Sequence, residues 1–358
     1  MLIKINATSI CGTDGQQYPT KPPGPVILGH EISGTIVEMG KDANLTIKSF
    51  SGPLAVGDRI ALYPWITCGR CPNCMTYGNG ACTVCDDSYH YGALHIPKGK
   101  GESKYGTSIY EFPYLTGGFA EYMYIYPGTY VWKVPADMPD NIASLLDPLA
   151  VAVRIVELAQ KAPGVLEDSF NLNSTVLVIG DGAIGVLTAL VARIMGANKI
   201  IIAGGRDKRL ATAKAISGAD VTMNYKNLSL AQRKEIVDDM TNGYGADVVF
   251  QCVGSVQAFN DGIELMKKVG TLIEAGNVRN VAVTEFDVTK NLCRKHATLI
   301  GMMVNTPTAF NKAFTLLTRF KKYNLENIFS HRCTLDTLDA TMKKMKDDDF
   351  LKGWVDFK

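Results

Sequence analysis

The sequence lacks several features that mark particular classes of protein. Its 37 Lys and Arg residues nearly balance 35 Asp and Glu residues, and a net charge of +2 gives no electrostatic footprint for nucleic acid or an anionic membrane. The longest apolar run, AIGVLTALVA, ends at Arg193 and falls short of the ~18 residues that a membrane-spanning helix needs. The start, MLIKINATS, has no signal-peptide pattern. We therefore expect a cytoplasmic protein that binds neither nucleic acid nor membrane.

Cysteine is present, but its pattern does not indicate a disulfide framework. The nine cysteines are an odd number, and in a chain without an export signal their clustering favours metal ligation. Cys68, Cys71, Cys74 and Cys82 are spaced C-x2-C-x2-C-x7-C, which lets four thiolates surround one tetrahedral zinc ion. Because four thiolates leave no open position, we predict a structural zinc site here, with Cys85 as a bystander.

The length of 358 residues predicts more than one domain. Short strand-like runs broken by glycine and proline turns fill residues 1–145 and indicate an irregular β domain. Residues 146–295 alternate strands with helices, which predicts an α/β domain with βαβ units and a parallel sheet. Residues 296–358 combine helical periodicity with two short strands, and they could close either domain.

A glycine turn in VLVIGDGAIGVL predicts a dinucleotide site. Gly180, Gly182 and Gly185 form G-x-G-x-x-G between an apolar strand and a helix, which is the context that makes this motif informative. The glycines permit the tight turn, close approach of a pyrophosphate and packing of the helix on the strand. The helix start, with Ala183 and Ile184, offers unpaired N–H groups to the phosphates.

The end of the next strand bears on the choice of cofactor. An acid usually stands there to hold the ribose hydroxyls of NAD, but this chain has Gly204, Gly205 and Arg206. A glycine leaves room for a 2′-phosphate, which Arg206 can bind bidentately, so we favour NADP over NAD. Two alternatives stay open. Arg206 and Lys208 could belong to a solvated helix start, and Asp207 could reach the ribose and favour NAD.

Motifs along almost the whole chain resemble those of the zinc-dependent medium-chain alcohol and polyol dehydrogenases, the family of sorbitol and threonine dehydrogenases. They include CGTD, GHEISGTIVEMG, CGRCPNC, GGFAEYMYI, DPLAVAV and GADVVFQCVGS. The resemblance implies a GroES-like catalytic domain in 1–145, a doubly wound Rossmann domain in 146–295, and a return of 296–358 to the catalytic domain. It also implies a nicotinamide cofactor, one catalytic and one structural zinc, and a homodimer or homotetramer.

The resemblance assigns roles to residues near the N-terminus. Cys11 and His30 would bind the catalytic zinc, and Glu31 would bind it directly or through a switch in coordination. Asp14 would orient His30, which fixes the imidazole tautomer. Thr13 would take the substrate proton and pass it to the nicotinamide ribose.

Two positions depart from the family pattern or leave its interpretation open. Asp147 occupies the third ligand position, where polyol and threonine dehydrogenases carry Glu and some NADP-dependent secondary-alcohol members carry Asp. It could bind zinc directly or through water, and because Pro148 follows it, it could also cap a helix. Gln16 stands where many members have a proton-relaying His, and glutamine cannot act as a general base.

Further expectations concern the substrate pocket and the chain outline. Tyr18, Tyr63 and Trp65 fall where relatives line the pocket. The aromatic-rich segment 86–118 could form a substrate lid, a subunit contact or a plain surface insertion. Because family members usually begin further upstream, two interpretations stay open: the opening strands are absent, or the start of the chain is misassigned.

The expected substrate is a small alcohol or carbonyl compound, with a polyol, sugar-derived alcohol or amino-alcohol favoured. An NADP-dependent dehydrogenase of simple secondary alcohols is the first alternative. A non-catalytic nucleotide-binding relative is the second, since Gln16 and Asp147 depart from the pattern. A zinc-free reductase on the same fold is disfavoured because Cys11 and His30 are both present.

Overall fold

The computed structural model describes residues 1–19, 26–82, 84–92, 115–166, 169–277 and 283–357. It divides into a first unit, Met1–Ala150 with Val304–Lys358, and a second unit, Val151–Met303. These divisions fall a few residues after the expected boundaries at 145 and 295. The helix α5 (Leu146–Lys161) spans the division between Ala150 and Val151. The strand β14 (Thr298–Gly301) belongs to the sheet of the second unit, so this unit extends beyond the expected boundary at 295.

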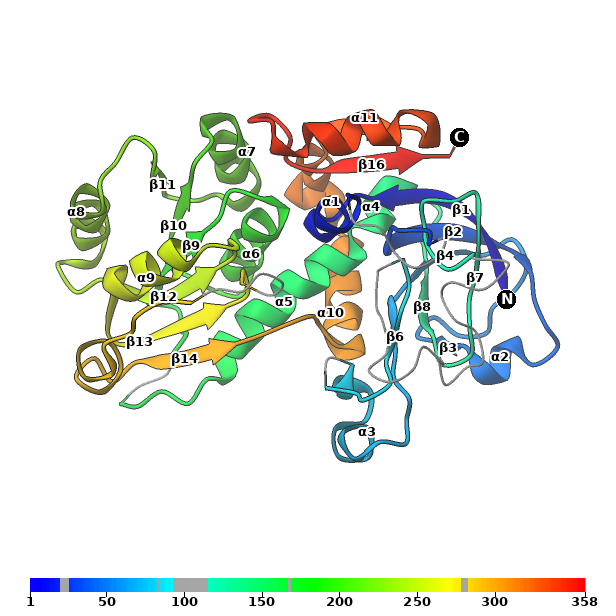
Figure 1. Cartoon of the computed structure of the whole chain (residues 1–358), viewed down its shortest axis with the longest axis horizontal. Coiled ribbons are helices and arrows are strands. Elements are labelled where there is room, and N and C mark those ends of the chain that lie inside the picture. The colour runs from blue at the N-terminus through cyan, green and yellow to red at the C-terminus, as the bar shows by residue number, and fades with distance from the viewer. Residues whose placement is uncertain (20–25, 83, 93–114, 167–168, 278–282, 358) are drawn as a thin grey trace. The chain divides into compact units, whose positions relative to one another are not determined.

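The first unit contains an eight-stranded, mostly antiparallel sheet (Figure 1). Its strands are β1 (Leu2–Ser9), β2 (Glu31–Glu38), β3 (Lys48–Ser49), β4 (Arg59–Leu62), β7 (Tyr122–Tyr124), β8 (Tyr130–Lys133), β15 (His331–Cys333) and β16 (Gly353–Asp356). They follow the order β15-β16-β1-β2-β4-β8-β3, and β7 also pairs with β1. The last strand of the chain therefore lies beside the first.

The pairing of β1 with its neighbours positions the residues of interest. Ser9 lies opposite Glu31 of β2, and on the other side it lies opposite Trp354 of β16. The inward-facing side chains of β1, such as Ile3 and Ile5, are buried in an apolar core that fixes this register. The C-terminal segment thus contributes two strands, β15 and β16, to the first unit.

Short helices complete the first unit. They are α1 (Gly12–Gln17), α2 (Ala43–Thr46), α3 (Pro72–Tyr77), α4 (Asp140–Ser144), α10 (Pro307–Leu317) and α11 (Leu338–Lys343), with single turns η1 (Gly78–Ala81), η3 (Phe320–Tyr323), η4 (Leu325–Ile328), η5 (Leu335–Thr337) and η6 (Lys344–Lys346). A separate two-stranded antiparallel sheet pairs β5 (Trp65–Ile66) with β6 (Tyr89–His90). Most of the aromatic-rich segment 86–118, namely residues 93–114, lies outside the described residues.

The second unit has a parallel, doubly wound sheet, which confirms the predicted α/β class. Its strands are β9 (Thr175–Ile179), β10 (Lys199–Gly204), β11 (Val221–Asn224), β12 (Ala246–Gln251), β13 (Met266–Glu274) and β14, in the order β11-β10-β9-β12-β13-β14. The helices are α6 (Ala183–Ile194), α7 (Asp207–Ser217), α8 (Leu230–Thr241), α9 (Val256–Leu265) and the π-helix η2 (Thr289–Cys293).

The sequence explains these elements. Every residue of β9 is buried, as expected for a central strand covered on both faces. Ser229 and Gln232 form a capping box that starts α8, and Gly218 ends α7 in a left-handed conformation. The strand order reverses between β9 and β12, and dinucleotides bind at such a switch point. None of the helices in the described part of the chain combines the length and apolar character of a membrane-spanning segment.

Candidate metal centres and cofactor site

Three residues of the first unit form what we call the mixed cluster. Cys11, His30 and Glu31 bring a sulfur, a nitrogen and an oxygen donor within 4.8 Å of one another. Cys11 is the N-cap of α1, while Glu31 begins β2. Zinc takes these donor types in catalytic sites, where three protein ligands leave one position open. The mixed cluster therefore fits a catalytic zinc ion.

Asp14 supports this cluster from α1. One carboxylate oxygen lies 3.4 Å from Nδ1 of His30, and the other accepts the backbone N–H of Cys11 at 2.8 Å. Burial lowers the pKa of His30, but the charges of Asp14 and Cys11 outweigh burial and raise this pKa well above its ordinary value. Metal-bound histidines commonly have a carboxylate at the second ring nitrogen, and Asp14 has this relation to His30.

Lys352 pairs with the carboxylate of the mixed cluster. Its Nζ lies 2.7 Å from Oε2 of Glu31, and both side chains are almost completely buried. The same ammonium donates to the carbonyl of Ile10 at 3.1 Å, and the hydroxyl of Ser9 donates to Glu31. Burial lowers the pKa of Lys352, yet the charge of Glu31 prevails and raises it. Sequence analysis missed Lys352, because only the pairing of β16 with β1 reveals its partner.

Thr13 has a hydroxyl suited to a bound group. Its Oγ1 is buried and has no hydrogen-bond partner among the described residues. A buried polar atom is expected to find a partner, so the unmet hydrogen bond fits a substrate or cofactor hydroxyl.

Asp147 lies outside the mixed cluster in the described residues, although its charge interacts with that of His30. Nδ2 of Asn305 donates to its carboxylate at 3.0 Å. Burial raises the pKa of Asp147 to about 6, and the charge of His30 opposes this shift. The capping alternative was wrong, because α5 already begins at Leu146 and Asp147 lies inside its first turn.

Trp65 is connected to the mixed cluster through a second histidine. Its ring stacks on that of His90 with centroids 3.9 Å apart, and the ring of His90 lies 5.1 Å from that of His30. His90 is buried, and the pairing of β6 with β5 places it beside Trp65.

The other two predicted pocket residues are engaged elsewhere. Tyr18 is 43% exposed, and its hydroxyl donates to Asp339 of α11. Tyr63 is 1% exposed, and its hydroxyl donates to the carbonyl of Asn305 at 3.1 Å. In this structure Tyr18 belongs to the surface and Tyr63 to the core of the first unit.

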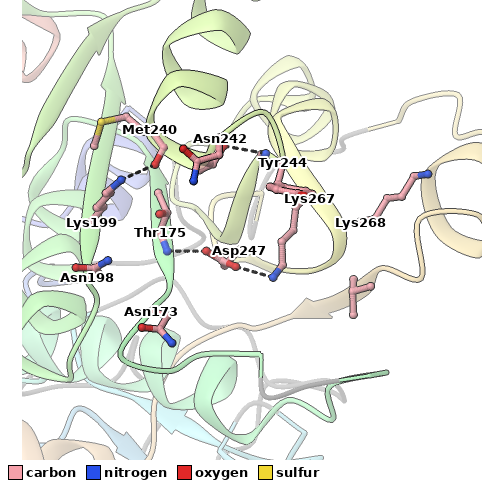
Figure 2. Close-up of a pocket in the computed structure, with 13 residues that line it drawn as sticks. Asn173, Thr175, Asn198, Lys199, Met240, Asn242, Tyr244, Asp247, Lys267 and Lys268 are labelled. Atoms are coloured by element: carbon pink, nitrogen blue, oxygen red, sulfur yellow. Dashed lines mark hydrogen bonds and ion pairs between the residues drawn. The ribbon is translucent and has the colours of Figure 1, made fainter.

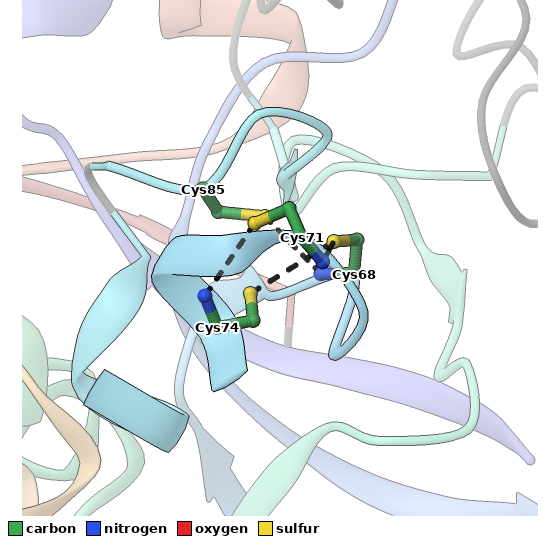
Figure 3. Close-up of side chains that lie close together, drawn as sticks. All are labelled: Cys68, Cys71, Cys74 and Cys85. Atoms are coloured by element: carbon green, nitrogen blue, oxygen red, sulfur yellow. Dashed lines mark hydrogen bonds between the residues drawn. The ribbon is translucent and has the colours of Figure 1, made fainter. Parts of the chain in front are cut away.

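A second group, which we call the four-cysteine cluster, joins Cys68, Cys71, Cys74 and Cys85 (Figure 3). Their sulfur atoms all lie within 4.8 Å of one another. The structure corrects the predicted membership, because Cys85 and not Cys82 provides the fourth sulfur. Cys82 follows η1, is buried, and directs its thiol to the carbonyl of Asn305 at 3.1 Å. The cluster has only sulfur donors and fits a closed, structural zinc site.

Backbone N–H groups surround these sulfurs. Cys68 Sγ accepts the N–H of Cys71 at 3.3 Å, and Cys85 Sγ accepts the N–H of Cys68 at 3.2 Å. Backbone donors at Asp86 and Cys74 lower the pKa of Cys71 to about 7, whereas burial raises that of Cys85 to about 12. N–H donors that stabilise thiolate prepare the cluster for a cation.

The glycine turn of the second unit has the form that a dinucleotide requires. Gly180 has a φ of +138°, and a side chain at Gly185 would collide with the carbonyl of Gly180. A Cβ on Gly182, the N-cap of α6, would meet nothing within 4 Å, so the backbone borders open space. Ala183 and Ile184 form the first turn of α6. This cradle fits a pyrophosphate.

The end of β10 carries further polar groups. The N–H of Gly205 donates to Oδ2 of Asp181 at 2.8 Å, and Arg206 lies 3.6 Å from the other oxygen of that carboxylate. Tyr225 also borders this place, since a Cβ on Gly205 would lie 2.5 Å from its hydroxyl. Sequence analysis missed Asp181 and Tyr225, because β11 and the glycine turn bring them here only in the folded sheet.

A pocket of about 380 Å³ lies at the opposite edge of this sheet (Figure 2). It is bordered by the amino ends of β9 and β10, whereas the glycine turn follows the carboxyl end of β9. Two of its lysines have internal partners, since Lys199 donates to the carbonyl of Met240 at 2.8 Å and Lys267 pairs with Asp247 at 2.6 Å. This pocket is therefore separate from the cofactor cradle.

The fold and these sites fit a two-domain, nicotinamide-dependent oxidoreductase. Residues 1–136 match the alcohol dehydrogenase GroES-like domain, and residues 183–319 match the zinc-binding dehydrogenase family. The chain belongs to the zinc-dependent medium-chain alcohol/polyol dehydrogenases, which confirms the family, the GroES-like and Rossmann fold classes and an enzyme of the alcohol dehydrogenase type.

Individual relatives agree with this assignment. The chain is 30% identical to a sorbitol dehydrogenase of Halalkalibacterium halodurans over 354 residues, or 98% of this chain and 89% of the relative. It is 31% identical over 276 residues to an L-threonine 3-dehydrogenase of Bacillus velezensis, covering 75% and 67% of the two chains. An alcohol dehydrogenase structure from Thermotoga maritima superposes with a TM-score of 0.85 at 27% identity, covering 99% and 91%.

Proposed function

We propose that this chain transfers a hydride between NADP and a polyol, sugar-derived alcohol or amino-alcohol, giving a ketone or aldehyde. The observation that carries the proposal is the mixed cluster, with three donor types within 4.8 Å of one another. The four-cysteine cluster would not serve, because four sulfurs leave zinc no open position.

The residues of the chain have separate tasks in this proposal. A zinc ion at the mixed cluster would act as a Lewis acid on the substrate oxygen, and a bound nicotinamide would exchange the hydride. Asp14 holds the ring of His30 in place, and Thr13 accepts the substrate proton. Since Gln16 does not titrate, the proton passes onward through water.

The substrate class follows from the relatives. Sorbitol dehydrogenase and L-threonine 3-dehydrogenase are named for a polyol and an amino-alcohol, and D-xylulose reductases also match this chain. This supports a substrate with more than one polar group. We also propose that the chain forms a homodimer or homotetramer in the cytoplasm.

The preference for NADP has its support at the end of β10. Gly204 itself carries no acidic side chain, and Arg206 and the hydroxyl of Tyr225 border the same place as Asp181. A guanidinium binds phosphate oxygens bidentately, which favours NADP.

A simple secondary alcohol is the second candidate substrate. Asp147, in place of the usual Glu, motivates this alternative, and it lies near His30 but outside the mixed cluster. A non-catalytic nucleotide-binding protein is a third possibility, and it would carry zinc at the four-cysteine cluster alone.

One set of measurements tests these alternatives. Metal analysis of the purified chain should find two zinc ions per chain, and Cys11→Ser should retain one. Exposed Cys293 provides a matched control, since Cys293→Ser should retain both. An activity screen over polyols, threonine and secondary alcohols with NAD and NADP then identifies the substrate class. One zinc in the unmodified chain and no turnover would exclude the proposed dehydrogenase.

A further inference from the structure

The end of β10 is where an acid would normally hold the ribose of NAD, and Gly204 stands there instead. The space is nevertheless occupied. A Cβ built on Gly204 would lie 2.5 Å from Cβ and 2.7 Å from Oδ2 of Asp181. Side chains at the two positions therefore exclude each other, and Asp181 fills the volume that an acid at position 204 would need.

Asp181 reaches this place from the glycine turn. It follows Gly180 after the carboxyl end of β9, and the central position of β9 beside β10 makes the two strand ends neighbours. Asp181 is only 6% exposed, and its Oδ2 accepts a hydrogen bond from the N–H of Gly205 at 2.8 Å. The carboxylate is thus fixed by a backbone donor at the end of β10.

The same carboxylate faces Arg206. The guanidinium lies 3.6 Å from Oδ1, so a 2′-phosphate that binds Arg206 would do so beside a negative charge. A ribose with two free hydroxyls would instead donate a hydrogen bond to that charge. The end of β10 therefore has both Asp181, which suits the ribose hydroxyls of NAD, and Arg206, which suits the 2′-phosphate of NADP.

We propose that Asp181 replaces the missing strand-end acid and determines cofactor selection, binding the ribose hydroxyls of NAD and limiting the preference for NADP that Arg206 provides. The inference rests on the proposed nicotinamide-dependent function. It predicts a chain that accepts both dinucleotides, with the ratio of their affinities controlled by the charge of Asp181.

The test is equilibrium binding of NADH and NADPH to the full-length, zinc-loaded chain, followed by nucleotide fluorescence without substrate. Asp181→Asn keeps an acceptor for the N–H of Gly205 but removes the charge. We expect NADPH binding to be favoured over NADH binding by about tenfold or more relative to the unmodified chain, as measured by the ratio of the two dissociation constants. This is the effect expected for the loss of a hydrogen bond to a charged group. Arg206→Ala should shift the ratio in the opposite direction.

A matched control removes a charge elsewhere in the second unit. Asp238 pairs with Lys234 within α8, so Asp238→Asn makes the same charge change and should leave the ratio as it is. An Asp181→Asn ratio equal to that of the unmodified chain would overturn the inference. If the unmodified chain binds neither dinucleotide, the proposed function itself is wrong. If it binds them and only the Asp181→Asn ratio is unchanged, the inference about Asp181 is wrong and the proposed function stands.

A second test moves the carboxylate from position 181 to position 204, so that the inference can still be tested if Asp181→Asn fails to fold. Gly204→Asp alone should destabilise the chain because of the clash with Asp181, and Asp181→Gly should relieve it, because it also removes the Cβ that would lie 2.5 Å from a Cβ at position 204. The double variant Asp181→Gly, Gly204→Asp should recover NADH binding relative to Asp181→Gly. A double variant with the same ratio of dissociation constants as Asp181→Gly would contradict the inference.

Discussion

The two clusters of the first unit hold their donors in different ways. The four-cysteine cluster comes from one short stretch of chain, and its sulfurs accept N–H bonds from that stretch. The mixed cluster joins Cys11 to the start of β2 and depends on Asp14 and on Lys352, which is more than 300 residues away in sequence. A closed site can be built locally, whereas the mixed site needs charges supplied by the rest of the unit.

The largest expected effect separates the two clusters by activity. Cys11→Ser removes one donor of the mixed cluster, so we expect turnover to fall by about 10³-fold or more, since the metal contributes several kcal/mol to catalysis. The four-cysteine cluster keeps its zinc. Steady-state kinetics with metal analysis measures both, and unchanged turnover would show that the reaction does not depend on this cluster.

The next effect concerns the charge that supports Glu31. Lys352→Met leaves a buried carboxylate without its partner, and we expect a loss of about 3 kcal/mol in the free energy of unfolding. Urea denaturation measures it. Lys344→Met, at an exposed lysine, is the control and should cost little. Equal stability of the two variants would mean that the buried pair contributes nothing.

A third variant pair tests the membership of the four-cysteine cluster. Cys85→Ser should weaken its zinc binding by about 100-fold or more, since losing a ligand exceeds the 10–100-fold loss of a supporting contact. Cys82→Ser should retain the metal, because the thiol of Cys82 is directed to Asn305. Competition with a coloured chelator measures the affinities. The reverse result would restore Cys82 to the cluster.

The smallest effect is a pH dependence at Asp147. Its pKa is raised to about 6 in the folded, metal-free chain, so folding favours the protonated acid. The stability that this group contributes is complete below pH ~4 and is lost as the pH rises through about 6. Asp147→Asn should remove this change, which we expect to be about 2 kcal/mol between pH ~4 and ~7 because one pKa unit corresponds to ~1.4 kcal/mol. Denaturation of metal-free protein at pH 4, 5, 6 and 7 measures it, and parallel curves would contradict the assignment.

The sequence predicts those features that depend on local spacing. Alternating strands and helices predicted the doubly wound sheet, and three of the four cysteines in the four-cysteine cluster followed from C-x2-C-x2-C. The fourth was missed because the spacing allows either Cys82 or Cys85 to lie beside the other three cysteines. The turn η1 and the carbonyl of Asn305 decide between them, and neither is visible in the spacing.

Contacts between strands that are distant in the chain could not be predicted from the sequence. Lys352 meets Glu31 only because β16 pairs with β1, and Tyr225 reaches Gly205 only because β11 lies beside β10. Tyr18 was expected in the pocket from its place in the chain, but α11 offers Asp339 to its hydroxyl. In each case a partner far along the chain sets the side chain's position.

The first unit is made of two separated segments, and this has a consequence for biosynthesis. Residues 151–303 form a continuous unit that can fold while the ribosome is still working, because domains generally fold as they emerge. The first 150 residues must wait for β16 and Lys352. Until then the nascent chain displays the free edge of β1 and an uncompensated Glu31, which exposes it to aggregation during the time before β16 is synthesised.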